Sequence, residues 1–157
     1  VALYHHRYDE AEEHYDRAIA INPNDVQLIS EMGAFKKYLG EVEEALDWIR
    51  QALRLSPTRN AWIWHEMGLA LITARRPAEA LEAFAKVEPP LPFDDIYVAI
   101  CHAKLGNVAE AKALARRVLM ARPGLSVKGW ATREPYYEKS DLDDFLDGMR
   151  IAGFPEE

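Results

Sequence analysis

The 157-residue sequence lacks the features of several large classes of protein. It has one cysteine, Cys101, so an internal disulfide is impossible and nothing indicates an oxidising compartment. It contains 19 Lys and Arg residues and 26 Asp and Glu residues. The resulting net charge of -7 disfavours nucleic-acid binding, which requires a basic surface. No apolar run approaches the roughly 20 residues that cross a bilayer. We therefore expect a cytoplasmic protein that binds neither nucleic acid nor membrane.

Catalytic motifs are also missing. The sequence has no G-x-x-x-x-G-K-[ST], no G-x-G-x-x-G and no G-x-S-x-G. Its histidines lack zinc-site spacing: His5 and His6 are adjacent, and His14 lies more than two helical turns away. Carboxylates occur as surface pairs such as Glu12 and Glu13. We expect no enzyme, no cofactor and no metal site in this chain.

The sequence does contain a pattern that recurs about every 34 residues. Each copy has an alanine near an acidic residue, at Ala11, Ala45, Ala80 and Ala111. Four residues later come Tyr15, Ile49, Phe84 and Ala115. A proline closes each copy, at Pro23, Pro57, Pro92 and Pro123. A spacing of four places two residues on one helical face, so the pattern predicts a series of similar helices.

A second helix precedes each of the later alanines. Met32-Gly33 and Met67-Gly68 occupy equivalent positions, where a glycine lets two helices approach closely. Seven residues after these glycines come Gly40 and Arg75, and Gly106 holds the same place in the next copy. Glycine there suits a left-handed helix ending. The sequence therefore predicts stacked helical hairpins.

These residues resemble the tetratricopeptide repeat, whose pattern is W-x2-L-G-x2-Y, then A-x3-F, then P. The best-matching copy is formed by Trp64, Met67, Gly68, Leu71, Ala80, Phe84 and Pro92. Other copies depart from the pattern, for example at Lys36, where an aromatic residue is expected. The resemblance implies an all-α fold, a right-handed α-solenoid of about three and a half hairpins. It would cover residues 1–123, with the first repeat truncated.

The period stops after Pro123, and residues 124–157 are expected to form an irregular connector and a last helix. Ser140 is a candidate N-cap for this helix, and Gly153 a candidate end. Its apolar stripe, which includes Phe145 and Met149, must be buried against something. The stripe could cap the last hairpin, or it could dock a partner or a second copy of the chain in a homodimer. Our interpretation is a capping helix.

The ending GMRIAGFPEE is similar to the C-terminal ending of bacterial multidomain proteins that place tetratricopeptide repeats after a class III adenylate cyclase domain. The matching residues are Gly148, Arg150, Ala152, Gly153, Pro155 and Glu156. The resemblance implies a bacterial fragment of a larger protein. It also implies an alternative function, the C-terminal regulatory domain of a multidomain adenylate or guanylate cyclase.

The tetratricopeptide resemblance further implies that the first helix of each hairpin lines a concave groove. The groove residues would then be Lys37, Tyr38, Trp62, His65, Leu69, Phe93, Tyr97, Ile100 and Lys104. We expect a scaffold or adaptor module that binds a peptide or helix of a protein partner there, with Trp62 and Tyr97 as anchors. The alternative is that the tail of the chain itself covers these aromatic residues.

Overall fold

The computed structural model describes residue 3, residues 7–57 and residues 61–157, and these residues contain nine α-helices and no strand. The helices are α1 (Tyr8–Ile21), α2 (Val26–Tyr38), α3 (Val42–Leu55), α4 (Ala61–Thr73), α5 (Pro77–Phe84), α6 (Asp94–Lys104), α7 (Val108–Ala121), α8 (Val127–Ala131) and α9 (Lys139–Ala152). The all-α prediction is confirmed.

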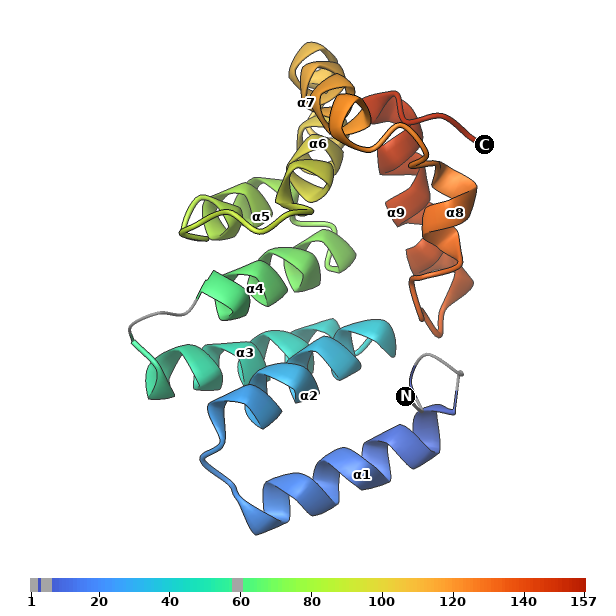
Figure 1. The fold of residues 1–157 in the computed structure, drawn as a ribbon. Coiled ribbons are helices and arrows are strands. Elements are labelled where there is room, and N and C mark those ends of the chain that lie inside the picture. Colours follow the sequence, from blue (N-terminus) through green and yellow to red (C-terminus); the bar gives the residue numbers. More distant parts are fainter. Residues whose placement is uncertain (1–2, 4–6, 58–60) are drawn as a thin grey trace.

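Three hairpins stack in chain order, α2 with α3, α4 with α5, and α6 with α7 (Figure 1). Helix α1 packs on α2 as the second helix of the truncated first repeat. Each hairpin turns through one residue in the left-handed region, at Gly40 (φ 82°), Arg75 (φ 57°) and Gly106 (φ 80°). Each turn also repeats one hydrogen bond that satisfies the end of the first helix. These bonds run from Glu41 N to Lys36 O, Arg76 N to Leu71 O, and Asn107 N to His102 O.

The predicted glycines bring the paired helices together. A Cβ atom built at Gly33 would lie 2.5 Å from Ile49 Cγ1, and one at Gly68 would lie 2.5 Å from Phe84 Cζ. Real Cβ atoms do not approach other atoms this closely, so only glycine fits both positions. In each hairpin the glycine of the first helix therefore meets the large apolar residue of the second.

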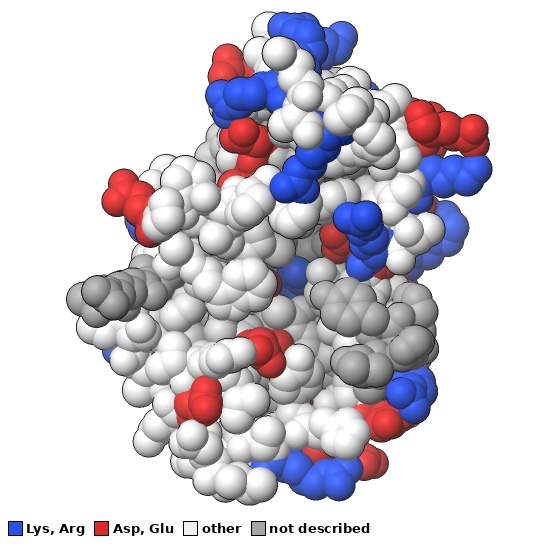
Figure 2. Space-filling model, in the orientation of Figure 1, with Lys and Arg blue, Asp and Glu red and all other residues white. Residues whose placement is uncertain are grey.

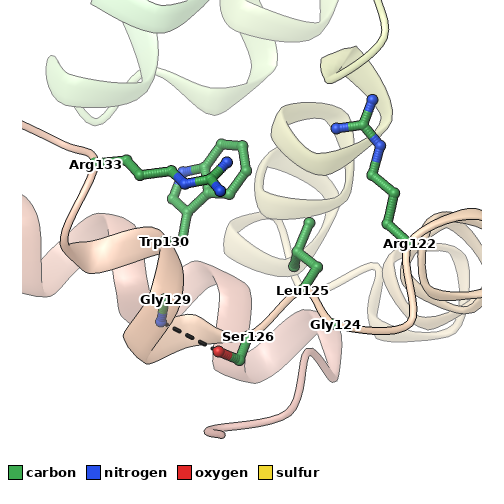
Figure 3. Close-up of a pocket in the computed structure, with 7 residues that line it drawn as sticks. All are labelled: Arg122, Gly124, Leu125, Ser126, Gly129, Trp130 and Arg133. Carbon is green, nitrogen blue, oxygen red and sulfur yellow. Dashed lines mark hydrogen bonds between the residues drawn. The ribbon is translucent and has the colours of Figure 1, made fainter.

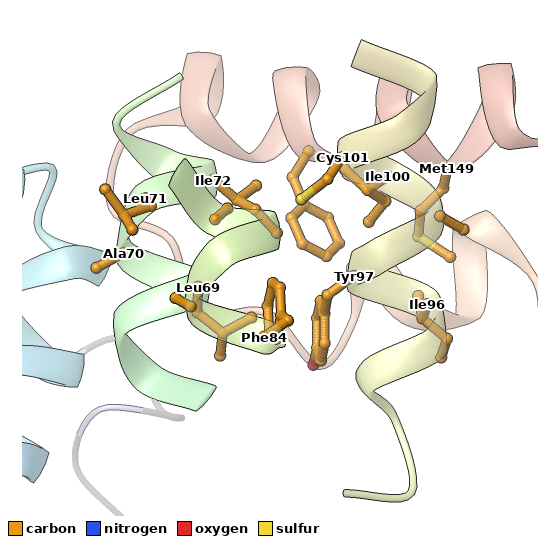
Figure 4. Packing of buried hydrophobic residues seen from close by; sticks show 14 of the residues in the cluster. Leu69, Ala70, Leu71, Ile72, Phe84, Ile96, Tyr97, Ile100, Cys101 and Met149 are labelled. Atoms are coloured by element: carbon orange, nitrogen blue, oxygen red, sulfur yellow. The ribbon is translucent and has the colours of Figure 1, made fainter. Parts of the chain in front are cut away.

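The hairpins and the tail share one hydrophobic core. Figure 4 shows Phe84, Tyr97 and Cys101 of the hairpins in the same cluster as Met149 of α9. Burial raises the pKa of the Cys101 thiol to about 12, so this cysteine is a packing residue rather than a nucleophile. The division of the chain after residue 123 stays a prediction.

Helix α9 packs on α6 and α7 and extends the stack. The buried apolar residues on its face are Phe145, Leu146, Met149 and Ala152. A Cβ atom at Gly148 would lie 2.6 Å from Ile100 Cγ2, so α9 and α6 are in close contact. Gly153 ends the helix in the left-handed conformation, as predicted. The predicted N-cap at Ser140 is wrong, because the helix begins at Lys139 and Glu138 is its N-cap.

The connector before α9 is more ordered than the sequence indicates, because it contains α8. It then runs back along the stack toward the N-terminal helices (Figure 1). The amide of Tyr137 donates to the carbonyl of Tyr38 in α2 over 2.8 Å, and the hydroxyls of Tyr136 and Thr73 of α4 lie 3.0 Å apart. The tail thus packs against the end of the stack and also against α2 and α4.

Candidate partner-binding surface

Helices α2, α4 and α6 form the surface that we call the inner side, and all nine predicted groove residues belong to these helices or to the residue before α6. Six of them are buried: Lys37, Tyr38, His65, Leu69, Tyr97 and Ile100. Phe93 and Lys104 are half-buried, and Trp62 is 50% exposed. Most of the predicted groove residues are therefore closed off from solvent, and their role in binding a partner stays a prediction.

The tail accounts for part of this burial. Its Glu134 accepts a hydrogen bond from the Tyr38 hydroxyl over 3.0 Å, and the ring of Tyr136 packs edge-on against that of Tyr38, 5.1 Å away. At α6, Lys104 forms an ion pair of 2.7 Å with Asp144 of α9. The tail therefore contacts the C-terminal ends of α2 and α6.

A buried charged cluster lies under the connector. Lys37 Nζ is 3.8 Å from Glu66 Oε2, and the side chains of both residues are almost fully buried. Burial raises the pKa of Glu134, while the Lys37 charge and the hydrogen bond from Tyr38 act in the opposite direction. The cluster ties α2 and α4 to the tail, because each of these elements contributes one of its members.

The N-terminal ends of α2 and α4 are open. Between them lies a pocket of about 470 Å³, lined by Val26, Gln27, Ser30, Glu31, Ser56, Trp62 and Ile63. We call it the Trp62 pocket. The Ser30 hydroxyl is buried and has no hydrogen-bond partner among the described residues, so it can accept or donate a bond to a ligand in the pocket.

A row of aromatic rings leads from this pocket across α6. The rings of Trp62 and His65 stack with centroids 5.4 Å apart, those of His65 and Tyr97 lie 5.5 Å apart, and those of Tyr97 and Trp130 lie 6.2 Å apart. His65 Nδ1 is 2.6 Å from Asp94 Oδ1, which fixes the imidazole in the row. This contact has no sequence signal, because the two residues are 29 positions apart.

A second pocket lies at the other end of the row and holds about 290 Å³ (Figure 3). Its lining residues are Arg122, Gly124, Leu125, Ser126, Gly129, Trp130 and Arg133. We call it the Trp130 pocket. The sequence analysis did not include any of these residues in the groove, because they belong to the end of α7 and to the tail.

Candidate metal ligands do not come together in the part of the chain that the structure describes. Within residues 7–57 and 61–157, no three His, Cys, Asp or Glu residues are grouped so that they could hold a metal ion. His5 and His6 lie outside the described residues. Of the helices that the structure describes, none is both long enough and apolar enough to span a membrane. The arrangement that stands out is instead the largely buried aromatic row, with the Trp62 pocket at one end and the Trp130 pocket at the other.

Comparison with known proteins relates parts of this chain to tetratricopeptide repeats. A family model described as tetratricopeptide repeat matches residues 7–25. The small glutamine-rich tetratricopeptide repeat-containing protein 2 of Mycosarcoma maydis is 33% identical over 79 residues, which are 50% of this chain and 22% of that protein. This chain thus spans under a quarter of that relative's length.

Two solved structures have a similar fold. PilW, a type IV pilus biogenesis factor, superposes with a TM-score of 0.71 over 96% of this chain and 72% of its own, at 24% identity. MamA superposes with a TM-score of 0.62 over 93% of this chain and 86% of its own, at 16% identity. At these identities the likeness concerns the fold alone. The chain is therefore an α-solenoid of stacked helical hairpins, and its matches support the presence of tetratricopeptide repeats.

Proposed function

We propose that this chain binds an apolar helix or extended segment of a protein partner along its inner side, and that the partner is anchored in the Trp62 pocket. The observation that carries the proposal is a half-exposed tryptophan beside a pocket of about 470 Å³ at the open end of the inner side. Large aromatic residues at the edge of a pocket are the usual anchors of protein interfaces.

The chemistry of the surface supports an apolar partner segment. Trp62, Val26 and Ile63 supply apolar area, and Gln27 and Ser30 supply a few hydrogen-bonding groups. In the view of Figure 2, the surface over α2 to α4 carries few charges. A mainly apolar wall with a few polar groups is typical of sites that receive a side chain of a partner.

The expected effect of Trp62→Ala is a loss of partner capture without a loss of fold. Truncation of a central aromatic anchor costs about 2 kcal/mol or more in binding, which is roughly a thirtyfold weaker affinity. The measurement is quantitative pull-down from the source cell with the full chain, read by mass spectrometry, beside circular dichroism of each variant.

Met120→Ala is the matched control, because Met120 is 87% exposed but lies on α7, away from the Trp62 pocket. Proteins that the Met120→Ala variant captures in the pull-down and the Trp62→Ala variant does not capture are the proteins that bind at the Trp62 pocket. Identical capture by wild type and both variants would remove the pocket from this account.

The covered residues of the predicted groove enter this proposal in a different way. Lys37, Tyr38, Leu69 and Ile100 are buried, so they would contact a partner only if the parts of the chain that cover them moved away. We therefore place the first contact at Trp62, and contact with the other residues after displacement of the tail. In this proposal the chain is a cytoplasmic scaffold and does not catalyse a reaction. The partner could also be a second copy of the chain, which would give a homodimer.

Regulation of a fused nucleotide cyclase is a second candidate, and the observation that favours it is the ending GMRIAGFPEE. In the structure these residues have packing roles: Gly148 contacts α6, Gly153 ends α9, and the carbonyl of Pro155 accepts a hydrogen bond from Val127 over 2.9 Å. The test is the coding sequence upstream of Val1. A reading frame without a cyclase domain there would remove this candidate.

A further inference from the structure

We infer that the Trp130 pocket binds a carboxylate of an acidic segment in the partner peptide, and that Arg122 and Arg133 hold this carboxylate. The inference rests on the proposed function, because it assigns the charge of the partner at the C-terminal end of the same inner side. The site lies on the tail and on the end of α7, apart from the groove positions that the repeat pattern predicts.

Arg122 and Arg133 line the same pocket, and neither has a carboxylate partner among the described residues. The protein has more acidic than basic residues, and several arginines pair with them, as Arg117 does with Asp95 and Arg150 with Glu156, whereas the exposed Arg54 and Arg116 do not. Arg122 and Arg133 form no ion pair with any described residue, although the chain has 26 carboxylate side chains. Two guanidinium groups beside one pocket are therefore left to bind an anion from outside.

Aromatic rings orient both guanidinium groups. Arg122 Cζ lies 3.9 Å from the centre of the Phe93 ring, and Arg133 Cζ lies 5.8 Å from the centre of the Trp130 ring. Figure 3 shows the two side chains on opposite sides of the pocket, with Leu125 between them. A guanidinium placed over a ring keeps its N–H edge free to donate, so each can form paired hydrogen bonds with a carboxylate.

The acidic residue next to Arg133 does not neutralise the pocket. Glu134 points to the inner side, where it accepts the hydrogen bond from Tyr38. The Ser126 hydroxyl accepts a hydrogen bond from the amide of Gly129 over 3.1 Å, which closes the wall of the pocket. Glu134 and Ser126 thus have partners of their own, and no ion pair with a described residue neutralises the two arginines.

A peptide carboxylate fits this pocket better than a nucleic acid. Nucleic acids are bound by extended basic faces, whereas the whole chain carries a net charge of -7 and the pocket supplies two cations. Leu125 and Trp130 add apolar area next to the arginines, which suits an apolar side chain beside an acidic one. The row of packed rings from Trp62 through His65 and Tyr97 to Trp130 lies between this pocket and the Trp62 pocket.

The test uses two fluorescein-labelled octapeptides, one of alternating leucine and glutamate and one with glutamine in place of each glutamate. We expect the full chain to bind the glutamate peptide at least about tenfold more tightly in fluorescence anisotropy at low salt, because charge-assisted hydrogen bonds to the arginines are lost with glutamine. The double variant R122Q/R133Q should lose this preference. The double variant R122K/R133K should keep only part of it, because lysine lacks the planar fork of arginine.

The matched control is R54Q/R116Q, which removes the same charge from two exposed arginines outside the pocket and should keep the preference. Equal affinity for the two peptides, no binding of the glutamate peptide, or an unchanged preference in R122Q/R133Q would overturn the inference. Tighter binding of inorganic phosphate than of the glutamate peptide would assign the pocket to phosphate groups instead. Self-association that R122Q/R133Q abolishes would assign it to a second copy of the chain.

Failure of this inference can be told apart from failure of the proposed function. Trp62→Ala should lower the affinity for both peptides by a similar factor, because in the proposed function Trp62 binds the leucine side chains that the two peptides share. If the glutamate preference is absent but both peptides depend on Trp62, the carboxylate site is wrong and the proposed function stands. If neither peptide depends on Trp62, the proposed function fails.

Discussion

A chain that lacks residues 124–157 should no longer unfold in a cooperative thermal transition and should aggregate at concentrations where the full chain stays soluble. The deletion exposes the faces of α6 and α7 that α9 covers. The buried side chains that it removes include Phe145, Leu146, Met149 and Phe154. Burial of each of these side chains stabilises the fold by about 1.5–3 kcal/mol. Together they contribute an amount similar to the net stability of a whole domain, which is about 5–15 kcal/mol.

Point variants of α9 test the same contact within a folded chain. Phe145 is buried and Ile151 is 43% exposed on the same helix. Phe145→Ala should lower the free energy of unfolding by about 3–5 kcal/mol, whereas Ile151→Ala should change it by at most about 0.5 kcal/mol. Urea unfolding followed by circular dichroism measures both. A truncated chain as stable as the full one, or equal effects of the two substitutions, would show that the tail does not cap the stack.

The second large effect is expected from Gly68→Val, which should lower the free energy of unfolding by about 2–3 kcal/mol. The new Cβ would lie 2.5 Å from Phe84 Cζ, so α4 and α5 would have to move apart or the ring would have to leave its site. Gly124→Val is the matched control, because a Cβ at Gly124 has no neighbour within 4 Å. Its effect should be at most about 0.5 kcal/mol.

A double-mutant cycle locates the clash. Phe84→Leu shortens the side chain that faces Gly68 and should recover at least about 1 kcal/mol of the loss that Gly68→Val causes. Additive effects of the two substitutions would show that the valine is tolerated next to the ring and that its cost arises elsewhere. Gly33 and Ile49 form the equivalent contact in the preceding hairpin, so the same test applies there.

The hairpins could be predicted from the sequence because their signals are local. Gly40 and Gly106 mark turns that the backbone makes in the left-handed region, and Gly33 and Gly68 mark close helix contacts. Each of these features depends on residues less than one repeat apart. Even Arg75, which has no glycine signal, was expected at a turn because the repeat period placed one there.

The path of the tail could not be predicted in this way. Its contacts with the inner side join residues far apart in the sequence, such as Thr73 with Tyr136 and Tyr38 with Tyr137. The aromatic residues of the connector are typical of a segment that packs against something, but they do not indicate which surface. For this reason the sequence identified the helices of the inner side and not the residues that remain open on it.

The same limit applies to the Trp130 pocket. Arg122 and Arg133 come from the end of α7 and from the connector, and only the folded tail places them beside one cavity. In the sequence each is one basic residue among ordinary neighbours. The pairing of arginines with rings, Arg122 with Phe93 and Arg133 with Trp130, becomes visible only in three dimensions.

The central claim is that the tail folds back over the inner side and leaves the Trp62 end open. Amide hydrogen exchange of Tyr137, resolved by nuclear magnetic resonance, tests it most directly. This residue lies outside the helices, and its amide donates to Tyr38 in α2. We predict that the Tyr137 amide exchanges as slowly as amides in the middle of α2, because breaking its hydrogen bond requires the tail to leave the stack. Exchange at the rate of an unprotected amide, while α2 and α4 stay protected, would contradict the claim.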